Sequence, residues 1–149
     1  MSRLLPFALA AALAASPTLA ADHGTADQAR TLLDRAVVKL TTDGPEKAFA
    51  AFNDKGSGFI DRDLYVFAFD MQGKYMASGA NPKLSGTDAK DLKDAEGKPL
   101  VREMIEIAGK KGTGEVDYVW LNRADNHIEK KHSLIRRVND YILGVGYYE

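Results

Sequence analysis

The residues best suited to chemistry in this sequence are polar and charged groups that could hold a small anion. Lys131 and Ser133 lie two positions apart, so in an extended strand both side chains leave the same face. A lysine ammonium on that face could clamp a carboxylate through a charge-assisted hydrogen bond. The alternative is a lysine at an exposed sheet edge. We predict that Lys131 and Ser133 contact a ligand.

Two pairs of aromatic residues show the same strand spacing. Tyr118 and Trp120 share one face, and their polar tips need hydrogen-bond partners if the side chains are buried. They either line a pocket or pack in the core. Tyr65 and Phe67 form a similar pair on an earlier strand, with core packing favoured for Phe67. We include all four among the predicted ligand-binding residues.

Three further polar residues complete the candidate site. Arg102 opens a helix and could bind a carboxylate through two parallel hydrogen bonds, unless it pairs with Glu106 one turn later. Ser78 and Asn81 stand at the exit of a predicted hairpin and could form the rim of a pocket. Asn81 equally suits a turn before Pro82.

Several kinds of chemistry are excluded by composition and spacing. The 149 residues include no cysteine, which excludes thiol catalysis and thiolate metal sites. None of the three histidines lies at a metal-ligand spacing from another. Neither a nucleophile with a base and an orienting residue nor a phosphate-binding loop is present. We therefore expect no enzymatic activity, no metal and no cofactor.

Charge and the first residues bear on partners and location. The formal net charge of −1, with acids and bases interspersed, argues against nucleic acid and anionic membrane surfaces as partners. Residues 1–20 combine Arg3, an apolar stretch at 4–15 and small residues at 16–20, which is typical of a secretory signal peptide cleaved after Ala20. The alternative is an uncleaved anchor. We expect residues 21–149 to be periplasmic or secreted, without stable membrane insertion after cleavage.

The N-terminal half of the exported part, residues 22–53, has helical periodicity. A long helix is predicted over 22–42 and a short one over 46–52, with Asp43 as the cap of the second. One apolar stripe follows the long helix, and it fits packing on the sheet of its own chain or a homodimer contact. Its residues are Ala26, Ala29, Leu33, Ala36, Val37 and Leu40.

The remaining part, residues 63–149, reads as a sheet with one helix. The first strand is apolar on both faces, which is typical of a strand covered on both sides. A long loop at 79–99 and a helix at 99–108 separate a hairpin from a later meander. We predict strands at 63–70, 74–77, 115–121, 128–138 and 141–148, and hence an α+β domain with an antiparallel sheet of about five strands.

Four segments of this sequence resemble the single Cache domain family (Cache type 2), which comprises extracytoplasmic PAS-like sensor modules. They are residues 65–86, 91–104, 114–120 and 131–133. The resemblance implies a long N-terminal helix packed on a central antiparallel sheet, and a pocket for a small organic metabolite such as a short carboxylate. It also implies signalling through a membrane sensor kinase or chemoreceptor. With no output domain in the sequence, we expect a stand-alone version that works through such a partner.

The sequence departs from the family at one position of the predicted pocket. The hairpin exit of the family often reads Ala-His-Gly-Ala-Asn-Pro, and Ser78 stands here at the histidine position. A hydroxyl is smaller than an imidazole and does not carry its charge. The pocket is then roomier or holds a different ligand. The alternative function is an interaction protein that has lost ligand binding and dimerises through its N-terminal helix.

Overall fold

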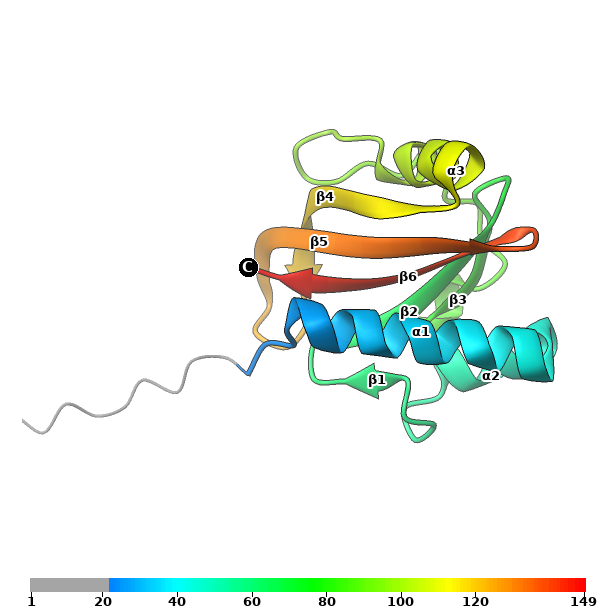
Figure 1. The fold of residues 1–149 in the computed structure, drawn as a ribbon. Coiled ribbons are helices and arrows are strands. Elements are labelled where there is room, and N and C mark those ends of the chain that lie inside the picture. Colours follow the sequence, from blue (N-terminus) through cyan, green and yellow to red (C-terminus); the bar gives the residue numbers. More distant parts are fainter. Residues whose placement is uncertain (1–21) are drawn as a thin grey trace, which may run out of the picture.

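The computed structural model describes residues 22–149, and the predicted signal peptide lies outside the described residues. The elements follow the predicted order of two helices, a hairpin, a helix and a meander (Figure 1). They are α1 (Ala26–Asp43), α2 (Pro45–Asn53), β1 (Ile60–Asp61), β2 (Leu64–Asp70), β3 (Tyr75–Ser78), the 3-10 helix η1 (Pro82–Leu84), α3 (Leu100–Lys111), β4 (Thr113–Asn122), β5 (His127–Val138) and β6 (Tyr141–Tyr148).

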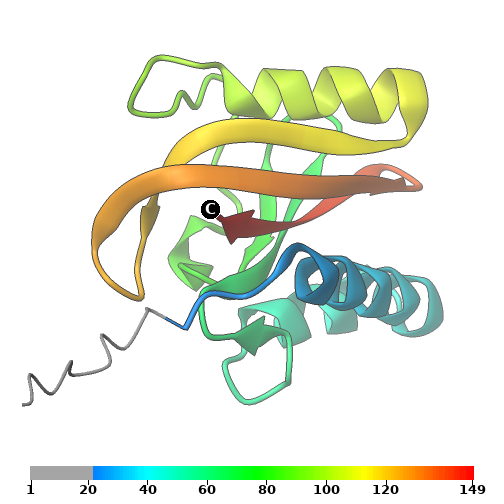
Figure 2. The same ribbon diagram turned by 60° about the vertical axis from the view of Figure 1, so that its left-hand side comes forward.

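The strands form one antiparallel sheet of six strands. Its order is β1-β2-β6-β5-β4, and β3 also pairs with β2. Helices α1 and α2 cover one face of this sheet, whereas α3 and the loop before it lie against β4 on the other side (Figures 1 and 2). The arrangement confirms the predicted α+β fold with a long N-terminal helix on a central sheet.

Strand β2 contributes side chains to two separate cores. Leu64, Val66 and Ala68 are at most 1% exposed and pack beneath α1 and α2. Phe67 and Phe69 point to the opposite face and pack against α3. Alternating apolar residues on both faces had predicted a strand covered on both sides, and this prediction is confirmed.

Helix α1 uses its apolar stripe within its own chain. A capping box between Thr25 and Gln28 starts the helix. Its stripe then packs against the sheet, so the structure favours the intramolecular alternative over the predicted homodimer contact. Four of the six residues named for that contact are at most 5% exposed, namely Ala29, Leu33, Ala36 and Leu40, while Ala26 and Val37 are partly buried.

The junction between α1 and α2 corrects one prediction. Asp43 does not cap α2, because it is still the last residue of α1 and its carboxylate pairs with Lys39 Nζ at 2.5 Å. Gly44 is the N-cap of α2 and adopts a φ of +83°. That left-handed backbone is strained for a residue with a Cβ, which explains why glycine and not aspartate occupies the junction.

Helix α3 is longer than its sequence predicted. The helix continues through Gly109 and ends at Lys111, with Gly112 in the left-handed conformation at φ +74°. A glycine inside a helix costs only about 1 kcal/mol relative to alanine, whereas a glycine beyond the last turn supplies a favoured stop. The second glycine, not the first, therefore ends the helix.

Candidate functional site

A small cavity lies between the inner face of β2, β3 and β4 and the start of α3. Its volume is about 40 Å³. One buried water needs roughly 10–15 Å³ on this measure, so the cavity holds about three or four water-sized groups. Six of the nine predicted ligand-binding residues line it: Tyr65, Phe67, Ser78, Asn81, Tyr118 and Trp120.

Lys131 lies directly behind this cavity. Its side chain is fully buried, and Nζ donates a hydrogen bond of 2.8 Å to the hydroxyl of Tyr65, which itself lines the cavity. The ammonium also faces the rings of Tyr65 and Tyr148, at 4.2 and 4.9 Å from their centroids. Burial lowers the pKa of Lys131 to about 7, against the opposing effect of the charge on Asp63. Lys131 thus reaches the cavity through Tyr65.

Gly146 makes the position of Lys131 possible. Strand β6 runs between β5, which carries Lys131, and β2, which carries Tyr65. A Cβ at Gly146 would lie 2.2 Å from Lys131 Cε and 2.5 Å from Ser133 Oγ. Only a residue without a side chain lets the lysine cross β6, so this glycine is required by a close approach and not by an unusual backbone conformation.

The hydroxyl of Tyr118 is held by the second residue of the Lys131–Ser133 pair. Tyr118 Oη and Ser133 Oγ are 2.8 Å apart and buried. The ring of Trp120 packs edge-on against Tyr118, with centroids 5.9 Å apart. Burial raises the pKa of Tyr118 well above its ordinary value and that of Tyr65 to about 12. Both phenols are therefore protonated near neutral pH and can donate a hydrogen bond to an anion.

Ser78 and Asn81 both line the cavity and shape the chain that leaves β3. Ser78 is only 3% exposed, its backbone NH donates to Asn53 Oδ1 at 2.8 Å, and its Oγ accepts from the NH of Asn81 at 3.3 Å. The side chain of Asn81 caps η1 by accepting from the NH of Lys83. For Asn81, the turn role and the rim role are therefore compatible.

The arginine at the cavity differs from the predicted one. Arg102 does not line the cavity, because its guanidinium lies on the exposed side of α3 and binds Asp91, with Nε at 2.8 Å from Oδ1. The predicted alternative partner, Glu106, pairs instead with Lys110. Arg123 lines the cavity in place of Arg102.

Sequence reasoning missed Arg123 for a geometric reason. Tyr118 and Trp120 alternate along β4, and the next residue on their face would be Asn122. The strand ends at Asn122, and the turn into β5 then directs Arg123 to the cavity. Other lining residues outside the prediction are Phe69, Tyr75, Ala80, Leu84, Leu100 and Met104, whose types are equally typical of core positions.

Comparison with known proteins gives relatives among chemoreceptors. Over 90 residues the chain is 30% identical to the methyl-accepting chemotaxis protein McpP of Pseudomonas putida, covering 59% of this chain and 16% of that protein. The chain therefore spans about a sixth of the length of this curated relative.

Solved structures share the fold. A methyl-accepting chemotaxis protein from Vibrio parahaemolyticus superposes with a TM-score of 0.69 at 21% identity, over 82% of this chain and 86% of the other. A structure described as the basis for carboxylic acid recognition by a Cache chemosensory domain gives a TM-score of 0.71 at 23% identity, over 82% and 91%. The sequence model of the family called single Cache domain 2 matches residues 30–149. This chain belongs to the single Cache domain 2 family.

Proposed function

We propose that this chain is an extracytoplasmic sensory module that binds a short carboxylate in the cavity beside Tyr65. The observation that carries the proposal is the fully buried Lys131, whose Nζ donates to the cavity hydroxyl of Tyr65. An ionised lysine in a protein interior is costly unless a negative charge compensates it. A carboxylate in the adjoining cavity supplies that compensation.

The hydrogen bond between Lys131 and Tyr65 gives the cavity its preference for anions. A protonated lysine can only donate, so the Tyr65 oxygen accepts and the phenol proton is left to point elsewhere. Toward the cavity, that proton meets a carboxylate oxygen. A neutral lysine can instead accept from Tyr65, which turns the lone pairs of the phenol toward the cavity. Anion binding and protonation of Lys131 therefore favour each other.

The remaining lining groups define the size and shape of the ligand. The volume of about 40 Å³ suits a carboxylate with a short carbon chain. Phe67 and Met104 supply the apolar wall, Tyr118 a second hydroxyl, and Arg123 a cation at the rim. Because the family consists of sensor domains, we propose binding without chemical conversion.

The family supports a proposal for the location and the output of the chain. Single Cache domains are extracytoplasmic sensor modules, and no helix within residues 22–149 has the length and hydropathy of a membrane span. We propose that the chain is exported by the predicted signal peptide. The occupied domain would then signal through a membrane chemoreceptor or sensor kinase.

Thermal unfolding of residues 21–149 with a panel of short carboxylates, amino acids and amines tests this function. A ligand at 100 times its dissociation constant adds about 2.7 kcal/mol of stability. At roughly 3–6 °C per kcal/mol for a domain of this size, the midpoint should rise by about 10 °C. We expect the rise only with short carboxylates.

Two variants make the test specific. Lys131→Met should abolish the rise, whereas Arg102→Gln, which changes a cation paired with Asp91 outside the cavity, should leave it unchanged. A rise in midpoint that persists in Lys131→Met, or no rise with any carboxylate, would contradict the proposal.

A further inference from the structure

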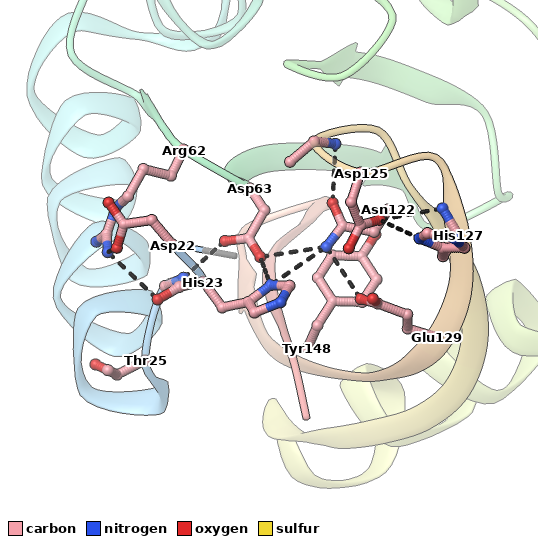
Figure 3. Close-up of polar contacts among 12 residues, drawn as sticks. Asp22, His23, Thr25, Arg62, Asp63, Asn122, Asp125, His127, Glu129 and Tyr148 are labelled. Carbon is pink, nitrogen blue, oxygen red and sulfur yellow. Dashed lines mark hydrogen bonds and ion pairs between the residues drawn. The ribbon is translucent and has the colours of Figure 1, made fainter. Parts of the chain in front are cut away.

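We propose that His23, Asp125 and Glu129 form a binding site for a divalent transition-metal ion such as Zn²⁺. One potential ligand atom from each residue lies within 4.8 Å of the other two. A histidine nitrogen with two carboxylate oxygens is a ligand set that zinc accepts, and three protein ligands leave a fourth position for water. Figure 3 shows these side chains converging between the segment before α1 and the turn from β4 to β5.

The imidazole of His23 is already oriented as metal ligands usually are. Its Nδ1 lies 2.7 Å from Asp63 Oδ2, and the Asp63 side chain is only 1% exposed (Figure 3). The backbone NH of Gly24 donates to the other oxygen of Asp63 at 2.7 Å. A metal-bound histidine typically donates its second ring NH to such a carboxylate, which fixes the tautomer and makes the other nitrogen more basic. With Nδ1 held by Asp63, Nε2 is the His23 nitrogen that would bind the metal.

The carboxylates of Asp125 and Glu129 are also positioned by hydrogen bonds. Asn122 is fully buried, and its amide nitrogen lies 3.1 Å from Glu129 Oε2. Asp125 Oδ1 accepts from the backbone NH of His127 at 3.1 Å. The turn between β4 and β5 thus brings Asp125 and Glu129, four residues apart, to the same side. Both side chains are partly buried, as is His23.

The charge balance of this cluster calls for a cation. Asp63, Asp125 and Glu129 bring three carboxylates around one imidazole. Asp63 pairs with His23 at 2.7 Å and its charge also acts on the buried Lys131, whereas Asp125 pairs with His127 at 3.6 Å. Among the described residues no lysine or arginine forms an ion pair with Asp125 or Glu129. Carboxylates this close repel one another unless a proton or a metal ion lies between them. A divalent ion would neutralise this excess and join the N-terminal segment to the β4–β5 turn.

The experiment is titration of residues 21–149 with Zn²⁺ by calorimetry, and with Co²⁺ as a spectroscopic probe. We expect one ion per chain, with cobalt absorption bands of a four-coordinate nitrogen and oxygen site. Glu129→Gln and Asp125→Asn should each weaken Zn²⁺ binding by more than the roughly 10- to 100-fold that loss of an outer partner costs. His132→Gln is the matched control, because it removes an imidazole that contacts Asp117 and Glu149 and lies outside the proposed ligand set.

The variants also separate this site from a chelate at the chain end. After cleavage at Ala20, His23 would be the third residue, and its imidazole could bind metal together with the terminal amine. That chelate would lose affinity in His23→Ala but not in Glu129→Gln. Full Zn²⁺ affinity in both carboxylate variants would overturn the proposal, as would absence of binding to the unmodified protein. Carboxylate-induced thermal shifts depend on Lys131, so the two proposals fail independently.

Discussion

Replacing Lys131 by methionine should make the protein more stable while removing ligand binding. The side chain keeps similar length, but the buried amine and its hydrogen bond to Tyr65 are lost. Burial lowers the pKa of Lys131 from 10.5 to about 7, a change of about three and a half pH units. At about 1.4 kcal/mol per unit, the buried charge costs on the order of 4–5 kcal/mol at pH values below 7.

The sign of the pH dependence follows from proton linkage. Between pH 7 and 10.5 the unfolded chain keeps the proton on Lys131 while the folded chain has released it, so stability rises with pH. The slope is at most about 1.4 kcal/mol per pH unit, which gives roughly 2–3 kcal/mol between pH 7.5 and 9.5. Lys131→Met lacks this contribution. Its advantage over the native protein should therefore be largest near pH 6 and smallest near pH 9.5.

Urea unfolding at pH 6, 7.5 and 9.5 measures this difference. Lys130→Met is the matched control, because the side chain of Lys130 is 74% exposed and points to the face of β5 opposite Lys131. The control should follow the native pH profile. Parallel profiles for the native protein and Lys131→Met would refute the reasoning, since they would mean that Lys131 is as readily charged in the folded chain as in water.

Three other outcomes follow from the same structure. The affinity for a short carboxylate should fall by up to about tenfold per pH unit above pH 7, because anion binding favours protonated Lys131. Calorimetry in buffers of different ionisation enthalpy should detect the uptake of a proton on binding. An affinity that does not change between pH 7 and 9 would contradict this prediction. Gly146→Ala should destabilise the fold by about 1–3 kcal/mol through overpacking against Lys131, and it should weaken carboxylate binding. Gly109→Ala is the control: a Cβ there meets open space, so the variant should stabilise α3 by up to about 1 kcal/mol. Equal effects of the two variants in urea unfolding would argue against the close approach of Lys131 to Gly146. Desolvation opposes protonation of His132, but hydrogen bonds to Asp117 and Glu149 outweigh this effect and raise the pKa of His132 above 6.5. The contribution of His132 to stability is therefore present below pH 6.5 and is lost as pH rises through the pKa of the folded state. His132→Gln should flatten the dependence of stability on pH in this range, and an unchanged profile would exclude this contribution.

The fold was largely predictable because its signals are local. Alternation along β2 and the stripe on α1 each lie within one element and predict which face is buried. The face of β5 that carries Lys131 and Ser133 was likewise predictable from the two-residue period of a strand. The end of α3 was less predictable, because Gly109 and Gly112 could each end the helix. Only Gly112 adopts the left-handed backbone conformation that ends it.

The candidate site was predictable only where one strand supplies it. Tyr118 and Trp120 follow from β4 alone, whereas the contact between Lys131 and Tyr65 depends on the placement of β6 between their strands. Arg102 has the right charge, but its position on α3 takes it to Asp91. Arg123 follows the end of β4, where the alternation of side chains along a strand no longer predicts the direction of a side chain.

The sharing of β2 between two cores has a mechanical consequence. Tyr65 faces the cavity and Val66, the next residue, lies beneath α1, so the two side chains are fixed to the same short length of backbone. Protein interiors are packed nearly as densely as crystals and cannot absorb a displacement by compression. If the proposed carboxylate displaces Tyr65, Val66 and the α1 residues packed on it should therefore move as well. Strand β2 can in this way transmit ligand binding at the cavity to the opposite face of the sheet, where α1 packs.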